Sequence, residues 1–196
     1  MGLPVLHSLL VNLRKPFLKH FPVPTPECIT GPRSVHEVPG RLKRYKGNRP
    51  LVVTDNVLLE LGLLAPVLGS LDANGIAYHV FSEIEPDPDF ATVRAGVERY
   101  QRENCDSLIL FGGGSVIDCG KAMAASIAKQ KDISKLVGLL RVLRPVPPMI
   151  AIPTTAGTGS EVGRSGVVTI EVNIAGDGTI YEPHFNQLLA IRQALR

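Results

Sequence analysis

One stretch of sequence decides the fold class of this 196-residue chain: Leu108-Ile-Leu-Phe-Gly-Gly-Gly-Ser-Val-Ile-Asp-Cys-Gly-Lys121. Its first four residues form a short apolar run, which is typical of a buried strand. Three glycines follow, and an alanine-rich helix is expected from there to about Ala128. A strand that turns directly into a helix is the repeating unit of parallel α/β sheets.

Further strands and helices alternate on both sides of this unit. Asp89 is expected to cap a helix that runs to about Asn104. Helical spacing of leucines predicts one helix over 57–73, and another helix is expected over 132–143. Short apolar runs predict strands at 51–54, 76–81 and 149–152. This alternation predicts a Rossmann-like parallel sheet with helices on both faces.

Composition excludes several classes of protein. Hydrophobic residues make up 44% of the chain, which is too many for a wholly disordered protein. The net charge is only +3 and aromatic residues only 5%, so we expect no nucleic-acid partner. No apolar run approaches the ~18 residues that span a membrane. Three cysteines at no metal-binding or redox spacing favour a reduced, cytoplasmic compartment.

Two glycine-rich loops, 112–115 and 153–160, follow predicted strands at the rim where open α/β sheets bind ligands. Backbone N–H groups at the start of a helix after Gly112-Gly-Gly-Ser115 favour a phosphate. The dinucleotide fingerprint would need glycine at Ile117, and the P-loop would need serine or threonine at Ala122. Neither motif fits, and a merely structural turn remains the alternative.

Three other features add candidate residues. Asp118 and Lys121 lie three positions apart and share one helix face, either as part of a site or as a surface ion pair. Loop 153–160 offers three threonine hydroxyls that suit a ribose or a pyrophosphate. Asp55, after the first strand, is either a helix cap or an acceptor for a ribose 2′-hydroxyl, and a carboxylate there favours NAD over NADP.

Together these motifs resemble a known family. Residues 112–121 are similar to the GGGSxxDxxK signature of the iron-containing (group III) alcohol dehydrogenases, and residues 152–161 resemble that family's second signature. The resemblance covers residues 27–170, which it identifies as a dinucleotide-binding domain. Residues 1–26 then form a basic amphipathic segment with a proline-rich connector, and residues 171–196 form a divergent tail.

The resemblance implies NAD as the cofactor and assigns roles to the candidate residues. The pyrophosphate would be held by Gly112, Gly113, Gly114 and Ser115, and the adenosine ribose by Asp55. Asp118 and Lys121 would brace the turn and the cofactor site. The cofactor cleft would be lined by Thr154, Thr155 and Thr158. Two departures from the family pattern, Ser82 and Asp87, would loosen the contact with the adenosine.

The resemblance also implies a second, all-helical domain, in which one aspartate and three histidines hold Fe²⁺ (or Zn²⁺). Its first two ligands form an Asp-x-x-x-His pair, whereas Asp177 and His184 of this chain are seven positions apart. We therefore expect no catalytic residue and no metal ligand in this chain, and a truncated form in which the helical domain is missing.

Three functions follow as hypotheses. By family, the protein is an NAD-dependent alcohol dehydrogenase that acts on a small-molecule alcohol or aldehyde, and this chain alone is inactive. The alternatives are a non-catalytic NAD-binding remnant and a generic phosphate-binding α/β module. The formation of a homodimer remains an alternative, because the surface that the helical domain would cover is expected to expose apolar residues.

Overall fold

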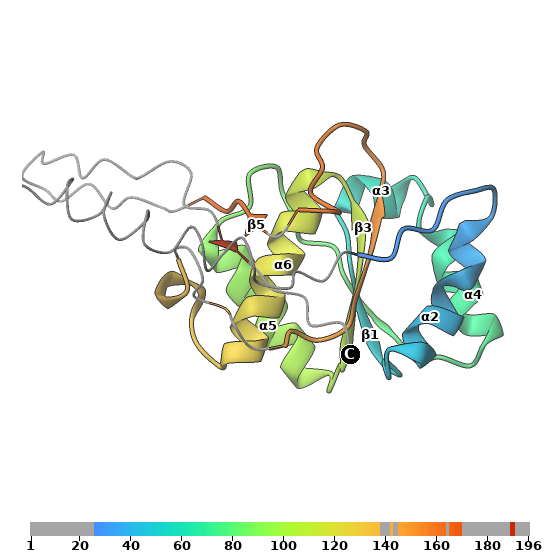
Figure 1. Ribbon diagram of the computed structural model, residues 1–196, viewed down its shortest axis with the longest axis horizontal. Coiled ribbons are helices and arrows are strands. Elements are labelled where there is room, and N and C mark those ends of the chain that lie inside the picture. Colours follow the sequence, from blue (N-terminus) through green and yellow to red (C-terminus); the bar gives the residue numbers. More distant parts are fainter. Residues whose placement is uncertain (1–25, 138–141, 143–144, 164, 170–188, 191–196) are drawn as a thin grey trace, which may run out of the picture.

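The computed structural model describes residues 26–137, 142, 145–163, 165–169 and 189–190 (Figure 1). Four strands form a parallel sheet in the order β2-β1-β3-β4. Their bounds are β1 (Pro50–Val53), β2 (His79–Phe81), β3 (Ser107–Gly112) and β4 (Met149–Pro153). In register, Val52 pairs with Val80 on one side and with Ile109 on the other. The parallel sheet that the alternating pattern predicts is confirmed.

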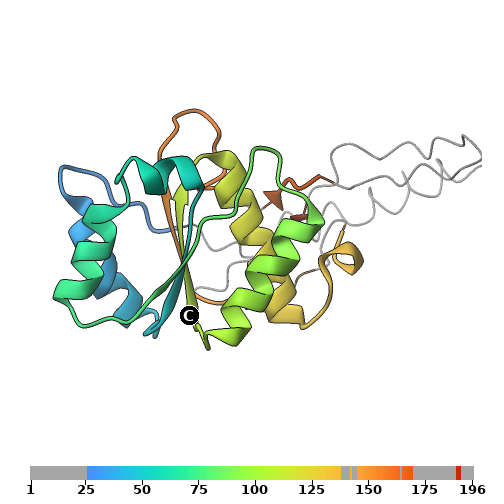
Figure 2. The same cartoon turned by 180° about the vertical axis from the view of Figure 1, so that it is seen from behind.

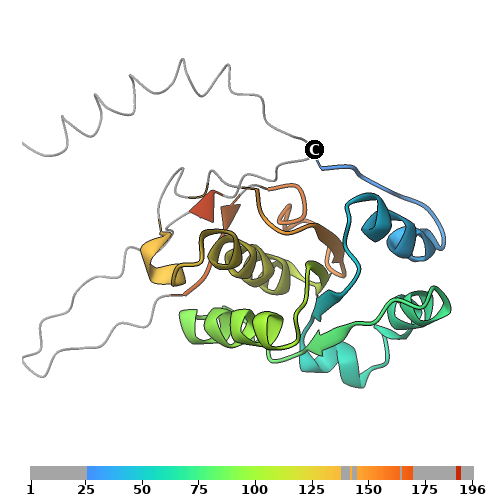
Figure 3. The ribbon, with the colours of Figure 1, turned by 90° about the horizontal axis from the view of Figure 1, so that it is seen from below.

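Helices cover both faces of the sheet, as expected (Figures 1 and 2). One face carries α2 (Val38–Arg44), which follows the 3-10 turn η1 (Ser34–Glu37), and α4 (Ala65–Ala73). The other face carries α5 (Phe90–Arg102) and α6 (Gly114–Lys129), which lie side by side (Figure 3).

Strand periodicity divides the apolar residues between these two layers. In β3, Leu108 and Leu110 pack in the cluster that includes residues of α5 and α6. Ile109 and Phe111 alternate with them and pack in the cluster that includes residues of α2 and α4. Because β3 is buried on both faces, its sequence is continuously apolar rather than alternating.

The chain changes faces at one point of the sheet. The connection from β1 to β2 runs through α3 (Asn56–Glu60) and α4, while the connections through α5 and α6 cross the opposite face. The loops that leave β1 and β3 therefore diverge. Between these two adjacent strands lies a topological switch point, the usual ligand crevice of an open α/β sheet.

The predicted helix over 57–73 is wrong, because the structure has two short helices there. Gly62 lies between them in a left-handed conformation with φ 70°. Pro66 follows in the first turn of α4, where it has no N–H to bond the carbonyl four residues earlier. The leucine spacing continues through the break, but the backbone does not.

The predicted helix over 132–143 is also not found in the described residues. Within residues 132–137, which the structure describes, the chain forms a short 3-10 helix, η2 (Ile133–Lys135). Asp132 accepts hydrogen bonds from Ser134 N at 3.0 Å and from Arg94 Nε of α5 at 2.6 Å. The Arg94 guanidinium holds the pKa of Asp132 well below its usual range. Residues 138–141 and 143–144 lie outside the described part.

The capping residue of α5 is confirmed. Asp89 Oδ1 accepts a hydrogen bond from Thr92 N at 2.7 Å and another from the Thr92 hydroxyl at 2.8 Å. Just before it, Asp87 has a φ of 54°, a conformation that aspartate and asparagine adopt more readily than most residues.

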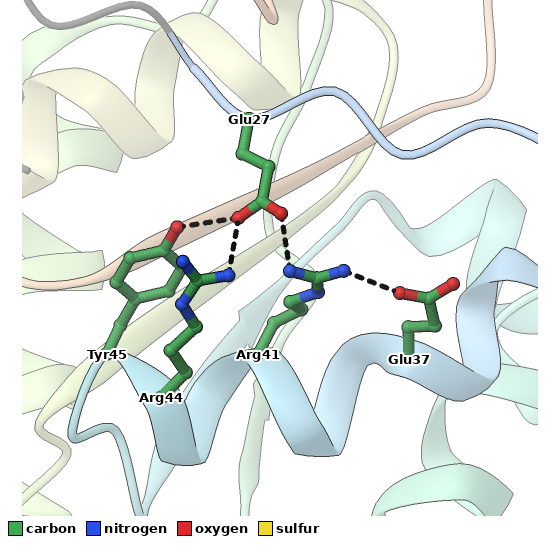
Figure 4. A network of polar contacts seen from close by, with 5 residues as sticks. All are labelled: Glu27, Glu37, Arg41, Arg44 and Tyr45. Atoms are coloured by element: carbon green, nitrogen blue, oxygen red, sulfur yellow. Dashed lines mark hydrogen bonds and ion pairs between the residues drawn. The ribbon is translucent and has the colours of Figure 1, made fainter.

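A cluster of charged residues attaches the start of the described chain to α2 (Figure 4). The Glu27 carboxylate pairs with Arg41, lies 3.5 Å from Arg44 Nη1 and accepts a hydrogen bond from the Tyr45 hydroxyl at 2.8 Å. Arg41 also pairs with Glu37 at 2.9 Å. The Tyr45 hydroxyl, together with the two arginines, lowers the pKa of Glu27.

Asp106 joins the starting ends of β1 and β3. Its carboxylate accepts hydrogen bonds from the backbone N–H groups of Asn48 and Arg49, the shortest at 2.9 Å, and from the Ser107 hydroxyl at 2.8 Å. These bonds satisfy backbone donors that precede the β1 ladder. They therefore help to hold the two central strands in register.

The segments expected at the two ends, 1–26 and 171–196, fall almost entirely outside the described residues. A second, two-stranded antiparallel sheet pairs β5 (Ser165–Gly166) with β6 (Leu189–Ala190). Large apolar side chains are exposed in α3 and in the turn after it, with Val57 at 64% and Leu61 at 66%. Helix α3 lies at the carboxyl rim of the sheet (Figure 1), and the expectation that a helical domain would cover these side chains stays a prediction.

Candidate functional site

The turn from β3 into α6 begins at a glycine that leaves no room for a side chain. A Cβ atom on Gly112 would lie 2.5 Å from Val116 Cγ2 and 2.7 Å from Val116 Cβ. The second of these atoms is fixed by the helix backbone and cannot rotate away. Gly113 follows as the N-cap in an extended conformation (φ −77°, ψ −169°) and supplies no side-chain cap.

The first turn of α6 therefore has uncapped N–H groups. The first helical hydrogen bond runs from Ile117 N to Gly113 O at 3.1 Å. The preceding N–H groups, those of Gly114, Ser115 and Val116, have no partner within the helix. By contrast, α3 and α5 begin with aspartates whose carboxylates accept such a bond. An uncapped helix start with a positive dipole end is suited to an anion.

The second loop, 153–160, lies directly against this turn. Thr154 N donates a hydrogen bond to Gly112 O at 3.0 Å. A Cβ on Gly113 would lie 3.2 Å from Thr155 Oγ1, and one on Gly114 would lie 3.3 Å from Thr158 Cγ2. The three threonines are exposed, so their hydroxyls are available at the rim. The structure thus brings together the two loops that the sequence singles out.

Asp118 and Lys121 form a buried ion pair, not the surface pair that was the alternative. Lys121 Nζ lies 3.5 Å from Asp118 Oδ1, and their side chains are only 6% and 15% exposed. Lys121 Nζ also donates a hydrogen bond to the carbonyl oxygen of Ser160. Burial lowers the pKa of Lys121, and the Asp118 carboxylate opposes that shift.

Asp55 lies at the end of β1, on the other side of the switch point from Gly112. Its Oδ1 accepts a hydrogen bond from Leu58 N at 2.8 Å, so it caps α3. A carboxylate has further acceptor sites, and capping therefore does not prevent a second bond to a ligand. Next to it, the buried Thr54 hydroxyl has no hydrogen-bond partner within the described part of the chain.

Sequence reasoning missed the residues that the ion pair holds. Ser160 and Val167 are 39 and 49 positions away from their partners in α6. No spacing rule in a single sequence connects residues so far apart. Gly120, within the first motif, has a packing role that the spacing does not indicate, since a Cβ there would overlap the Leu110 side chain of β3.

The described residues contain no group of three or more histidine, cysteine, aspartate or glutamate side chains placed to hold a metal ion. In the same residues, no helix is both long and apolar enough to cross a membrane.

Comparison with protein families identifies the chain. The family model described as iron-containing alcohol dehydrogenase matches residues 24–191. The chain belongs to this family. It is 38% identical to 1,3-propanediol dehydrogenase of Citrobacter freundii over 141 residues, which are 71% of this chain and 36% of the relative. It is also 38% identical to NAD-dependent methanol dehydrogenase of Bacillus methanolicus over 144 residues, 74% of this chain and 38% of the relative.

A solved structure from the same family, an alcohol dehydrogenase from Oenococcus oeni, superposes with a TM-score of 0.72 at 36% identity. The match covers 78% of this alcohol dehydrogenase-family chain and 40% of the other. The chain thus spans about 40% of the length of the relatives it matches, and the resemblance seen in the two motifs is confirmed.

Proposed function

We propose that this chain is the NAD-binding part of an alcohol dehydrogenase. The proposal rests on one observation above all: α6 begins at an uncapped glycine turn, next to three exposed threonines of the second loop. A pyrophosphate placed there would accept hydrogen bonds from the N–H groups of Gly114 and Ser115. The Gly113 position keeps side-chain atoms away from the approaching phosphate.

Further residues at the rim would orient the two halves of the dinucleotide. The hydroxyls of Thr154, Thr155 and Thr158 would donate to phosphate or ribose oxygens. The free acceptor capacity of Asp55 suits the adenosine ribose, and its negative charge would repel a 2′-phosphate, so NAD is favoured over NADP. That one relative is named an NAD-dependent enzyme supports this choice.

When bound, NAD would accept a hydride from a primary or secondary alcohol, and NADH would give a hydride to the matching aldehyde or ketone. The residues of this chain would hold and orient the cofactor, and none of them is assigned a catalytic role. We place the protein in the cytoplasm, where the three unpaired cysteines would remain reduced.

The test is a binding experiment with a variant that separates stability from affinity. Gly113→Asp places a capping carboxylate at the start of α6, and because glycine is itself a favourable N-cap residue the free energy of unfolding is expected to change by only a few tenths of a kcal/mol. The same carboxylate would occupy the phosphate position and repel it. We therefore expect little change in the melting temperature together with at least a tenfold loss of NADH affinity, followed by nicotinamide fluorescence.

Gln101→Glu is the matched control, because it adds the same charge on an exposed position of α5. It should leave NADH binding unchanged. If Gly113→Asp bound NADH as tightly as the unaltered chain, the phosphate would not sit on α6. Equal, weak binding of NADH, NADPH and ATP to the unaltered chain would favour the generic phosphate-binding module instead.

A further inference from the structure

The charge of the chain is distributed unevenly along its length. Residues 1–50 hold nine of the 21 lysines and arginines but only two of the 18 acidic residues, Glu27 and Glu37, so their net charge is +7. The remaining residues carry −4, and the +3 of the whole chain conceals this contrast. Such an asymmetry between two parts of a chain is typical of a protein that meets an anionic partner.

The described part of this basic region lies at the edge of the sheet opposite the glycine turn. Residues 38–49, which form α2 and the turn into β1, contain five lysines and arginines and no acidic residue. They lead directly into the starting end of β1, whereas the glycine turn follows the carboxyl end of the parallel strand β3. Helix α2 ends at this starting edge (Figure 1). We call its exposed cations the basic rim: Lys43, Arg44, Lys46 and Arg49.

Most of the basic rim is not neutralised within the described part of the chain. The Arg44 guanidinium lies 3.5 Å from the Glu27 carboxylate. No ion pair joins any other described residue to the remaining three cations, Lys43, Lys46 and Arg49. Their charges are therefore available to a partner.

The chain enters the described structure beside the basic rim. The Glu27 carboxylate is bound by the side chains of Arg41, Arg44 and Tyr45, which belong to α2 and to the residue that follows it (Figure 4). Residues 1–26 are thus joined to the rest of the protein at α2. Their sequence has no acidic residue, seven leucines and valines within residues 3–13, and three cations, Arg14, Lys15 and Lys19.

We propose that the basic rim and residues 1–26 bind the protein to an anionic lipid surface. The lysines and arginines are attracted to acidic headgroups, and the apolar side chains of residues 3–13 add the hydrophobic part of the affinity. Two such signals together hold a protein on a membrane more firmly than either does alone. The glycine turn, at the opposite edge of the sheet, then faces away from the lipid.

A nucleic acid fits these residues less well than a lipid surface. Its phosphates would attract the same cations, but they offer nothing to the seven leucines and valines of residues 3–13. Proteins that hold single strands also stack bases on aromatic side chains, and aromatic residues make up only 5% of this chain.

Co-sedimentation of the full chain with phosphatidylcholine vesicles, with and without about 30% phosphatidylserine, tests the proposal. We expect binding only to the vesicles that contain phosphatidylserine. Raising the salt concentration from about 0.1 M to about 0.5 M should weaken it at least tenfold, because salt screens exposed charges. Lys43→Gln combined with Lys46→Gln should also weaken binding at least tenfold, since each cation near the surface contributes about fivefold in affinity.

Lys131→Gln combined with Lys135→Gln is the matched control, because it removes the same charge from two exposed lysines. These lysines flank Ile133 of η2, which packs with α5 and α6 on the other face of the sheet from α2 (Figure 3). This control should bind vesicles within twofold of the unaltered chain. Leu9→Gln combined with Leu10→Gln tests the apolar part, and should weaken binding at least tenfold while leaving its dependence on salt unchanged.

Several results would overturn the proposal. Failure of the unaltered chain to sediment with phosphatidylserine vesicles would exclude the lipid surface. Equal losses in the two lysine pairs would show that net charge, and not the basic rim, causes the binding. Unchanged binding in the leucine variant, or tighter binding to a DNA duplex than to the vesicles at the same salt concentration, would mean that lipid is the wrong partner.

Discussion

Replacing Gly120 by alanine introduces a methyl group where α6 crosses β3. The new Cβ would overlap Leu110 Cδ2 and lie 2.7 Å from Leu110 Cδ1, where ordinary contacts are 3.4–4 Å. Leu110 is only 1% exposed, and its side chain is enclosed by the core cluster shared with α5 and α6. The methyl group can therefore fit only if the Leu110 side chain shifts within the core.

Two opposing effects determine the size of the change. Alanine in a helix interior is favoured over glycine by about 1 kcal/mol. Inserting a methyl group into a packed core typically costs about 1–3 kcal/mol, through shifted side chains and backbone. Gly69 of α4 isolates the first effect, because a Cβ there meets nothing within 4 Å. The free energy of unfolding of Gly69→Ala should therefore exceed that of Gly120→Ala by about 1–3 kcal/mol.

Urea unfolding of the two variants and the unaltered chain measures this difference directly. A double-mutant cycle supplies the second check. Leu110→Ala alone should cost about 2–5 kcal/mol, and combining it with Gly120→Ala should cost less than the sum, because the clash is relieved. If Gly120→Ala were as stable as Gly69→Ala, or if the two changes at the contact were simply additive, the close helix–strand approach would not be the reason for this glycine.

Two other predictions concern ionisable groups. Burial raises the pKa of Asp106, but the hydrogen bonds it accepts, that from Arg49 N foremost, outweigh burial and lower it. The ionised Asp106 therefore stabilises the folded chain fully above the pKa of the unfolded state, near 3.8, and this contribution is lost as the pH falls through the lower pKa of the folded state. In Asp106→Ala, the free energy of unfolding, measured by circular dichroism, should fall less steeply as the pH is lowered. Burial raises the pKa of Cys105 to about 11 and also raises the pKa of Cys119, whereas Cys28 is exposed. A thiol reagent at pH 8 should therefore label Cys28 at once and the two buried thiols only in urea. Fast labelling of all three thiols in the folded chain would contradict the packing.

The parts of the fold that depend on local pattern could be predicted from the sequence. The apolar run of β3 and the glycines after it located the turn, and Asp89 marked the start of α5. The break at Gly62 was missed although Gly62 and Pro66 are both visible, because the leucine spacing outweighed two local signals that end a helix. The short η2 was missed for another reason, since a tertiary contact from Arg94 holds Asp132 in place.

In the candidate site, too, the sequence predicts contacts between residues close in the chain but not contacts with distant segments. The spacing of Asp118 and Lys121 predicted a shared helix face, but not that the pair is buried. Burial depends on where the segment 160–167 returns to the helix, which no property of residues 112–121 determines. The sequence leaves two roles for Asp55, capping a helix and binding a ribose. The structure shows the capping bond, whereas ribose binding can be tested only with a ligand.

The contact between Lys121 and Ser160 also has a consequence for the order of folding. It closes a loop of 39 residues, and the contact between Asp118 and Val167 closes one of 49. The entropy lost in closing such loops must be offset before the contacts themselves can form, and the pairing of β3 with β4 is what shortens the gap. We therefore expect the sheet to assemble before the loops at its carboxyl rim. During synthesis, we expect a chain that has reached β4 to fold its core before the proposed cofactor site can form.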